Sequence, residues 1–522
     1  MKNSFNYSKV SIYSMIKNNV SDYGDRTSFI NNLNKTKYDS FIQKIDEYAL
    51  SFYNMGINKG DVVTLILPNS IDTFVCIYAL NKIGAICNIM HHLSSEEEIN
   101  TSINETLSHF IITYEDKLKS IENITSKECI YNVIYLSIND IVSPFDKIKN
   151  IFKKSIILPS KYISFYRLRI IGKHNKKNVK VCDKEDNLAI IISNHSKKIY
   201  LTNKNINSYA INYSYNNDVL TQKNRYLCDS SIINSIPLIH RTLIYGQTVI
   251  INSSEDINKF VDNIIKFRPN ILEISPNTLE YLCSNKKVNK EDLSYLKLII
   301  CGSSLLRDNV YQKAKFFLKN HYSNSKVVAS FGMLESTSNI TINDNLDDKI
   351  ESAGLPIKGT SIKIINPDTK KECKPNEEGL ICISGPTICR NDYNNLICSD
   401  DIGYLDEDGY LYYKSSMKRI IVSNGNKIYP EDIENIVKKH EYVKDASIVG
   451  VPHPYKKEVV KLYIVLKDKL ILNSEIKKSI KDYCEKNISK YALPYAYAYR
   501  KELPKTNVGK IAYEELVNLK EE

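Results

Sequence analysis

Residues 188–206, LAIIISNHSKKIYLTNKNI, form the stretch whose residue types are best suited to meet a phosphate group. A short apolar run leads into a polar, basic turn, where Ser193, Ser196, Lys197 and Lys198 offer hydroxyl and ammonium groups. The ammonium groups attract phosphate by charge, but the stretch contains no glycine. Backbone N–H groups therefore cannot approach a phosphate as they do in a glycine-rich cradle. The stretch predicts a phosphate-facing position with altered chemistry.

Alternating helical and strand patterns surround this stretch and predict how it is held. Strand-length apolar runs alternate with segments of helical spacing, the rhythm of parallel strands covered by helices. The first set comprises a helix over 38–57, a strand over 61–70 and a helix, glycine and strand over 72–90. The second comprises a strand at 188–192, a helix from about 205, a strand at 247–252, a helix at 257–267 and strands at 270–275 and 296–302.

The pattern changes to short strands and turns from Ile362, which predicts an antiparallel or barrel-like region. A compact α+β piece follows Lys418. The fold class is therefore α/β, with a large N-terminal domain over 1–417 and a small domain over 418–522. A chain of 522 residues is too long for one hydrophobic core, which agrees with two domains.

The overall composition is that of a globular protein, with 43% hydrophobic and 25% charged residues. No apolar run reaches the roughly 18 residues of a membrane span, and the N-terminus is too polar for a signal peptide. Twelve cysteines are scattered without a CxxC pair, which favours reduced thiols over disulfides or zinc. We expect a cytoplasmic protein, and no nucleic-acid-binding module is recognisable.

The net charge of +11 is concentrated in residues 147–180, which contain eleven lysine and arginine residues and no acidic residue. Apolar and aromatic residues are interleaved with these charges. One interpretation is peripheral contact with an anionic surface. The other, which we favour, is a solvated insertion with a few side chains packed onto the domain.

Several motifs, in sequence order, resemble the adenylate-forming superfamily of acyl-CoA synthetases, peptide-synthetase adenylation domains and luciferases. The resemblance covers nearly the whole chain, is most specific in the C-terminal third and is closest to acyl-CoA synthetases. The motifs are GINKGDVVTLILPNS (56–70), LKLIICGSSLL (296–306), FGMLES (331–336), SAGLPIKGTSIKIINPDT (352–369), DIGYLDEDGYLYY (401–413), SNGNKIYPEDIE (423–434), VGVPHP (449–454) and LPKTNVGK (503–510).

The resemblance implies a two-step reaction and a C-terminal domain that rotates between the steps. A carboxylate attacks the α-phosphate of ATP to give acyl-AMP, and a thiol then takes the acyl group. ATP or AMP, Mg²⁺ and CoA are the implied cofactors and acceptor. A carrier-protein thiol in place of CoA remains open.

The motif positions imply roles for individual residues. Asp401 matches the aspartate that accepts hydrogen bonds from both ribose hydroxyls. Glu335 matches the magnesium ligand, and Phe331 the aromatic residue that stacks on adenine. Lys510 matches the lysine that neutralises charge between the reacting carboxylate and the α-phosphate. Glu335 and Lys510 are the implied catalytic residues.

Three further positions belong to the implied site. Lys418 falls at the hinge between the domains, where one residue would absorb the change in backbone dihedrals. Gly425 fits the glycine that lets the pantetheine arm of CoA pass the backbone, although a plain turn glycine explains it equally well. Gly302 lies in a motif expected to contact the nucleotide.

The departures from the family pattern concern the phosphates. ISNHSKK (192–198) replaces a longer loop of threonine, serine and glycine, Leu334 replaces a threonine, and Ser416 replaces an arginine. Each lost charge-assisted hydrogen bond costs roughly 1.5–3 kcal/mol. His240 resembles a pocket-bordering histidine, but its spacing from Gly246 is too short, so it fits a helix residue equally well.

The favoured function is therefore an ATP-dependent acid–thiol ligase of fatty acid metabolism. The alternative is a catalytically impaired homologue that senses or scaffolds AMP or an acyl-adenylate. Apolar segments suggest a fatty or aromatic acid, but core packing explains them equally well.

Overall fold

The computed structural model describes most of the chain. The described residues are 9–20, 22–31, 34–125, 130–136, 161–174, 179–194, 197–213, 221, 223–229, 231–252, 256–302, 304–389, 396–416, 419–423, 426–453, 457–468, 470–488, 492–505 and 511–518. The chain divides into two compact units, residues 1–362 with 383–397 and residues 363–382 with 398–522.

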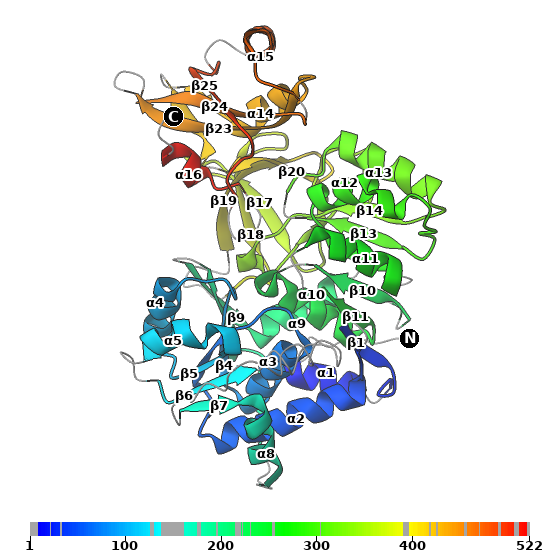
Figure 1. The fold of residues 1–522 in the computed structure, drawn as a ribbon, viewed down its shortest axis with the longest axis vertical. Helices are drawn as coiled ribbons and strands as arrows, with labels where there is room; N and C mark the ends of the chain where they lie inside the picture. The colour runs from blue at the N-terminus through cyan, green and yellow to red at the C-terminus, as the bar shows by residue number, and fades with distance from the viewer. Residues whose placement is uncertain are drawn as a thin grey trace. The chain divides into compact units, whose positions relative to one another are not determined.

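The first unit contains two seven-stranded sheets (Figure 1). One has the order β7-β6-β5-β3-β4-β8-β9 and is parallel except for the antiparallel pair β8–β9. Its strands and the helices near them in sequence are α2(Tyr38–Asn54), β3(Val62–Ile66), α3(Ile71–Ile83), β4(Ile86–Met90), α4(Glu96–Thr106), β5(Phe110–Tyr114), η1(Glu115–Lys117), α5(Leu118–Thr125), β6(Asn132–Leu136), β7(Tyr162–Ser164), α8(Phe165–His174), β8(Leu188–Asn194) and β9(Lys197–Thr202).

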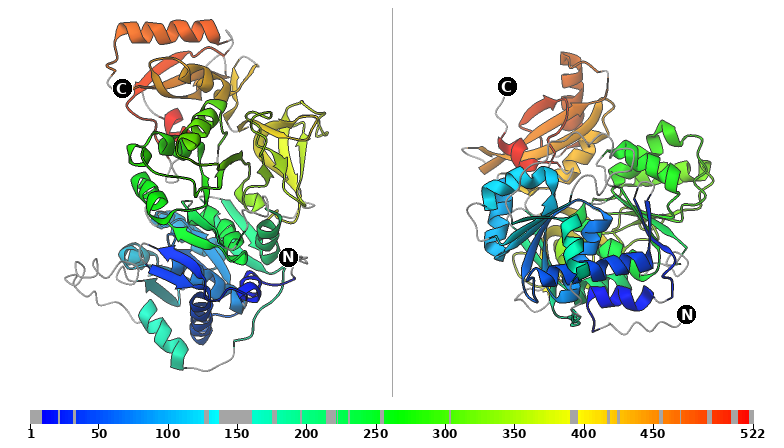
Figure 2. Two further views of the ribbon diagram at one scale, coloured as in Figure 1. Left: turned by 90° about the vertical axis from the view of Figure 1, so that its right-hand side faces the viewer. Right: turned by 60° about the horizontal axis from the view of Figure 1, so that its bottom comes forward.

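The other sheet has the order β14-β13-β12-β10-β11-β1-β2 and is parallel except for β1–β2. Figure 2 shows its green strands from two further sides. Its elements are α1(Ile12–Val20), β1(Thr27–Asn31), β2(Asn34–Lys37), α9(Asn203–Asn212), β10(Arg225–Cys228), α10(Ile232–Ile244), β11(Thr248–Ile251), α11(Ile257–Phe267), β12(Ile271–Ile274), α12(Pro276–Ser284), η2(Lys286–Val288), β13(Leu298–Cys301), α13(Asp308–Asn320) and β14(Lys326–Ala329). The turn η3(Leu334–Ser336) and the short pair β15(Thr341–Ile342) and β16(Leu355–Pro356) follow.

Helix α3 is buried around nearly its whole circumference, as expected of a helix that packs on several sides. It contacts β4 of one sheet, and its Phe74 stacks on Phe29 of β1 in the other. The Ser70 hydroxyl caps its first turn by accepting a hydrogen bond from the N–H of Thr73, and Gly84 ends it at φ +83°. Helix α3 therefore joins the two sheets through one core.

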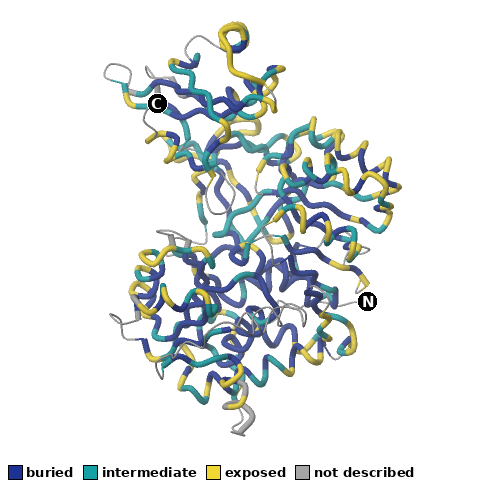
Figure 3. The backbone as a smooth tube through the Cα atoms, in the orientation of Figure 1, coloured by how far each residue is buried: buried dark blue, intermediate teal, exposed yellow. Residues whose placement is uncertain are grey.

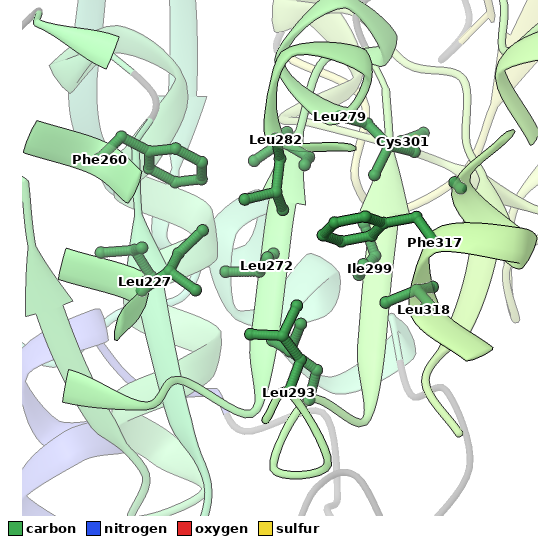
Figure 4. Packing of buried hydrophobic residues seen from close by; sticks show 14 of the residues in the cluster. Leu227, Phe260, Leu272, Leu279, Leu282, Leu293, Ile299, Cys301, Phe317 and Leu318 are labelled. Atoms are coloured by element: carbon green, nitrogen blue, oxygen red, sulfur yellow. The ribbon is translucent and has the colours of Figure 1, made fainter. Parts of the chain in front are cut away.

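The two faces of the β10–β14 sheet differ in character. Side chains alternate between the faces of a strand. Leu227, Leu272 and Ile299 belong to an apolar cluster with residues of α11, α12 and α13 (Figure 4). Tyr226 and Glu273, each one residue away along the same strands, therefore face the opposite side. Helix α10, which contacts α9 and β10, is buried at almost every position (Figure 3).

The second unit contains a four-stranded sheet of order β17-β18-β19-β20 and a five-stranded sheet of order β22-β21-β24-β23, in which β25 also pairs with β24 in parallel. The region that we predicted to be antiparallel or barrel-like corresponds to the first of these. The elements are β17(Ser361–Ile365), β18(Gly379–Ser384), β19(Leu396–Leu405), β20(Leu411–Ser416), β21(Ile421–Ser423), β22(Asn426–Ile428), α14(Pro430–Lys438), β23(Val443–His453), β24(Lys457–Leu466), α15(Ser474–Asn487), β25(Ala496–Arg500) and α16(Tyr513–Asn518).

A buried ion-pair network holds α14 in the second unit. Arg419 donates to Glu431 and Glu434 at 2.5 Å each, and the three side chains are 14%, 15% and 7% exposed. The Glu434 carboxylate also accepts hydrogen bonds from the Ser447 hydroxyl and the Ile448 N–H. Because every partner is largely removed from water, losing the arginine would leave two buried carboxylates without their counter-charge.

The α/β fold class is confirmed, as are the helices and strands that we predicted in both sets. The expectation that all cysteines are reduced thiols is wrong at two positions. Cys382 and Cys398, on the neighbouring strands β18 and β19, form a disulfide, and nine other described cysteines are free. Pairing of these strands brings together cysteines that are separated by 16 residues in sequence.

The division at residues 417 and 418 remains a prediction. The compact second unit also includes residues 363–382 and 398–416, which carry most of the four-stranded sheet. None of the described helices is long and apolar enough to cross a membrane.

Candidate active site

The loop after β14 follows the carboxyl end of a parallel strand, the edge at which ligands bind in open α/β sheets. Its backbone is held closely. The Phe331 N–H donates to the Thr341 hydroxyl at 2.8 Å, and the Phe331 carbonyl accepts from the Ile340 N–H at 2.7 Å. A Cβ atom on Gly332 would lie 2.3 Å from the Ser338 carbonyl oxygen, so only glycine fits this close approach.

The turn η3 carries Glu335, which is half-buried. The Glu335 carbonyl accepts a hydrogen bond from the Cys389 N–H at 2.7 Å. Thr337 adopts φ +73°, and its hydroxyl donates to the Thr387 carbonyl at 2.5 Å. Segment 387–389 therefore braces the turn from outside, and the position of Glu335 is set by contacts far away in sequence.

A magnesium ion that arrives with a nucleotide fits this residue. Mg²⁺ prefers oxygen ligands and commonly binds one or two carboxylates together with phosphate oxygens and water. Within the described residues, no three His, Cys, Asp or Glu side chains gather into a metal-binding cluster. Glu335 supplies a single carboxylate of the required type at the edge of the sheet.

Gly302 directly follows β13, so it lies at the same edge of the sheet. Its N–H donates to the Ile274 carbonyl at 3.2 Å. A Cβ atom there would lie 3.1 Å from the side-chain nitrogen of Asn339, which pairs with Gly332 in an isolated antiparallel bridge. Gly302 and the loop that carries Phe331 and Glu335 are therefore neighbours, as the sequence motifs predict for a common site.

The predicted phosphate loop lies in the β8–β9 hairpin. Strand β8 continues to Asn194, beyond the predicted strand, and Ser193 pairs with Lys198 across the hairpin. The Ser193 side chain is buried. Its hydroxyl donates to the Asn88 side-chain oxygen Oδ1 at 2.8 Å and accepts from the Ser102 hydroxyl at 3.0 Å. Contact with a phosphate would require this hydroxyl to leave a buried polar network.

Lys198 is also engaged within the first unit. Its ammonium group forms an ion pair with Glu105 of α4, and burial lowers the pKa of Lys198. Lys197 lies in strand β9, whereas Ser196 lies outside the described residues. The hairpin therefore presents less free charge than its sequence suggests.

Asp401 lies in β19 of the second unit, and its backbone N–H donates to the Ser399 hydroxyl at 3.1 Å. In the β19–β20 pair it is directly opposite Ser416. Side chains directly opposite in an antiparallel pair are close, with Cβ atoms about 4.5–5.5 Å apart. The missing arginine is thus replaced by serine beside the residue that we expect to bind ribose.

Lys418, Gly425 and Lys510 lie outside the described residues, so their roles stay predictions. The described residues that flank the last of them, Lys505 and Ile511, form an isolated antiparallel bridge.

His240 is a core residue of α10. Its ring is fully buried and hydrogen-bonded on both sides, to the Tyr78 hydroxyl at 3.0 Å and to the Asn207 side-chain oxygen at 2.8 Å. Burial lowers the pKa of His240 to about 3, so the ring is neutral near pH 7. The structure supports the interpretation of His240 as an ordinary helix residue over its interpretation as a histidine that borders a pocket.

A buried polar cluster that was not predicted from the sequence is connected to Gly302 through Asn339. Arg241 of α10 approaches Glu273 of β12 with 3.4 Å between Nη2 and Oε2, and each side chain is 6% exposed. The other Glu273 oxygen accepts a hydrogen bond from the Asn339 amide at 2.6 Å. Charged residues within the apolar runs SIPLIHRTLIYG and NILEIS are the signal that could have revealed this pair.

Asp229, which follows the carboxyl end of β10, was also missed. It accepts a hydrogen bond from the side-chain amide of Asn252 at 2.7 Å. Burial raises the pKa of Asp229 to about 6, so a proton is held there under mildly acidic conditions.

Two family models match the chain. Residues 16–391 match the AMP-binding enzyme family, and residues 432–510 match the AMP-binding enzyme C-terminal domain. Among curated proteins, a long-chain-fatty-acid–CoA ligase of Salmonella typhimurium is 25% identical over 97% of this chain and 94% of its own. The luciferin 4-monooxygenase of Photuris pensylvanica is 24% identical over 91% of this chain and 88% of its own.

Solved structures share the fold. ATP-bound MatB from Rhodopseudomonas palustris superposes with a TM-score of 0.83 at 18% identity, covering 97% of this chain and 98% of that one. The anthranilate CoA ligase AuaEII, in complex with anthranoyl-AMP, gives a TM-score of 0.82 at 17% identity and covers 99% and 98% of the two chains. Because a family model matches well over half of the chain, the predicted superfamily is confirmed, and the protein belongs to the AMP-binding enzyme family.

Proposed function

We propose that the protein is an ATP-dependent acid–thiol ligase of the acyl-CoA synthetase type. A carboxylate oxygen attacks the α-phosphorus of ATP, giving acyl-AMP and releasing pyrophosphate. The thiol sulfur of CoA or of a carrier protein then attacks the acyl carbon and releases AMP. Curated relatives named long-chain-fatty-acid–CoA ligases, which cover nearly the whole chain, support this class.

The observation that carries the proposal is the braced turn at the carboxyl edge of the β10–β14 sheet. It holds an aromatic residue, Phe331, four residues before a half-buried carboxylate, Glu335. An aromatic face binds adenine by stacking, and a carboxylate binds magnesium, so one rigid loop offers both groups. We assign adenine stacking to Phe331, the magnesium ion to Glu335 and a close backbone approach to Gly302.

Asp401 is proposed to bind the ribose hydroxyls, because a carboxylate accepts two hydrogen bonds from a cis-diol. Lys510 is proposed to neutralise the reacting carboxylate and the α-phosphate, Lys418 to act as the hinge at the start of a domain over 418–522, and Gly425 to adjoin the pantetheine arm. These assignments rest on motif position.

The proposed site offers few groups that could bind the phosphates of ATP. We assign them to Lys197, with Ser193 and Lys198 able to contribute only after leaving Asn88 and Glu105. Because these two groups already have partners, we expect slow adenylation and weak ATP binding. The same observation is what favours the alternative of an AMP or acyl-adenylate sensor.

Two measurements separate the two functions. Calorimetry compares the binding of ATP–Mg²⁺ with that of AMP, and an assay then measures pyrophosphate release with and without a carboxylic acid substrate. A ligase releases pyrophosphate only when an acid is present. AMP binding without measurable ATP binding or pyrophosphate release, over a broad set of acids, would contradict the ligase and support the sensor. Asp401→Ala should weaken AMP binding about tenfold, as expected for a lost charge-assisted hydrogen bond.

Three broader expectations remain proposals. The compartment is proposed to be the cytoplasm, and the acceptor is CoA or a carrier thiol. Peripheral contact of segment 147–180 with an anionic surface, the alternative to the favoured solvated insertion, is the third. The described parts of that segment include β7 and α8, and Tyr166 of α8 is exposed.

A further inference from the structure

The buried pair formed by Arg241 and Glu273 lies on the polar face of the β10–β14 sheet. On the opposite face, the residues that pack against α11, α12 and α13 form a continuous apolar cluster (Figure 4). Apolar side chains would fill both faces equally well, and replacing a buried ion pair with apolar residues is often neutral or stabilising. Stability alone therefore gives no reason for charges at this place.

The pair is directly connected to the proposed nucleotide loop. The Asn339 amide donates to Glu273 at 2.6 Å and lies against Gly302. Tyr213, whose ring is 5.0 Å from the Arg241 guanidinium carbon, shares a hydrogen bond of 3.1 Å with the hydroxyl of Ser330, the residue before Phe331. Through Asn339 and Tyr213, the cluster is therefore connected to the loop that carries the proposed nucleotide-binding residues.

The cluster also has unused hydrogen-bonding capacity. The hydroxyl of Tyr226 is fully buried and has no hydrogen-bond partner among the described residues. The ring of this tyrosine lies 5.9 Å from the guanidinium carbon of Arg241. Arg241 donates to Glu273 through Nη2. A buried hydroxyl without a partner, such as that of Tyr226, is rare, because it costs free energy when it is removed from water.

Resting on the proposed ligase function, we propose that Arg241, Glu273 and Tyr226 determine the acid specificity by forming a polar end to the acid-binding site. The acid is short, and its far end carries a neutral group that accepts a hydrogen bond, such as a hydroxyl or keto oxygen. Arg241 and Tyr226 donate to this oxygen, and a hydroxyl donates in turn to Glu273.

The buried pair Arg241–Glu273 limits both the chain length and the charge of the acid. Protein interiors are close-packed, so a long alkyl chain would have to displace two buried charges. A dicarboxylic acid would place a second anion beside Glu273, and like charges disfavour each other in a medium of low dielectric constant. A hydroxy or oxo acid brings no charge and satisfies the donors that are present.

The test uses the full chain and 5′-O-(N-acyl)sulfamoyl adenosines, which imitate acyl-adenylates but do not react. The acyl groups are 3-hydroxybutanoyl, butanoyl, tetradecanoyl and succinyl. Calorimetry should show the 3-hydroxybutanoyl compound binding about tenfold or more tightly than the butanoyl compound, and tetradecanoyl binding most weakly.

The paired variant Arg241→Met with Glu273→Gln removes both charges together and leaves Asn339 an acceptor. It should keep the melting temperature and reduce the preference for the hydroxyl group to less than threefold. The matched control is Lys287→Met with Asp262→Asn, an exposed ion pair of the same unit with 2.6 Å between Nζ and Oδ1. The control should keep the full preference.

The outcomes separate this inference from the function on which it rests. Equal binding of the short compounds, tightest binding of the tetradecanoyl or succinyl compound, or an unchanged preference in the paired variant would overturn the inference while leaving an acyl-adenylate site. Absence of binding by all four compounds would refute the proposed function and the inference together.

Discussion

Replacing Gly332 with alanine tests whether the loop after β14 is the rigid platform of the site. A Cβ atom at this position would lie 2.3 Å from the Ser338 carbonyl oxygen and 2.4 Å from the Asn339 Cα. Non-bonded carbon atoms prefer about 3.5–4.0 Å, so the two strands of the loop must separate by about 1 Å. Both obstacles are backbone atoms, which no side-chain rotation can move aside.

The expected result is a large loss of activity with the fold preserved. A displacement of about 1 Å at residues that position a substrate can lower the rate about 100-fold. The loop carries Phe331 and Glu335, so we expect pyrophosphate release to fall by about that factor and AMP binding to weaken. The core of the β10–β14 sheet lies in other residues, so the circular dichroism spectrum should be unchanged.

The matched control is Gly60→Ala, where a Cβ atom would have nothing within 4 Å but φ is +91°. This substitution should lower the free energy of unfolding by about 1–2 kcal/mol through backbone strain alone and leave the rate unchanged. A folded Gly332→Ala protein whose rate stays within threefold of the original would contradict a rigid loop, because the loop would then be free to adjust.

Three other substitutions test further parts of the structure. Arg419→Ala should lower the free energy of unfolding by about 3–5 kcal/mol in urea titrations, because it leaves two buried glutamates unpaired; a loss below 1 kcal/mol would contradict a buried network. The pKa of the Asp229 carboxyl is about 6 in the folded protein and near 3.8 in the unfolded chain, so the folded state binds the proton more tightly. The free energy of unfolding therefore falls as the pH rises between these values. Asp229→Asn should therefore flatten that pH dependence and raise the free energy of unfolding at pH 7 by up to about 3 kcal/mol, and an unchanged pH profile would exclude this explanation. Lys510→Ala should abolish pyrophosphate release with an unchanged melting temperature, and activity that survives would mean that another group neutralises the reacting anions.

Much of the architecture could be predicted because it follows from residue patterns within short segments of the chain. Helix α2 and strand β3 follow from apolar spacing and from the turn residues that end them. The predicted strand at 188–192 was too short, however, since β8 continues to Asn194 and pairs with β9. Local patterns do not show whether a polar segment will be covered by a neighbouring strand, so the phosphate loop could not be recognised as a hairpin.

The family, the order of the elements and the types of residue at the site could be predicted from the chain, because motif spacing and hydrophobic period are properties of the chain alone. The partners of individual side chains, by contrast, depend on the folded arrangement. The Ser193 hydroxyl donates to the Asn88 side chain, strand register sets Asp401 opposite Ser416, and Arg241 of helix α10 contacts Glu273 of strand β12. These encounters depend on strand register and helix packing between distant segments, which determine partners that no local spacing records.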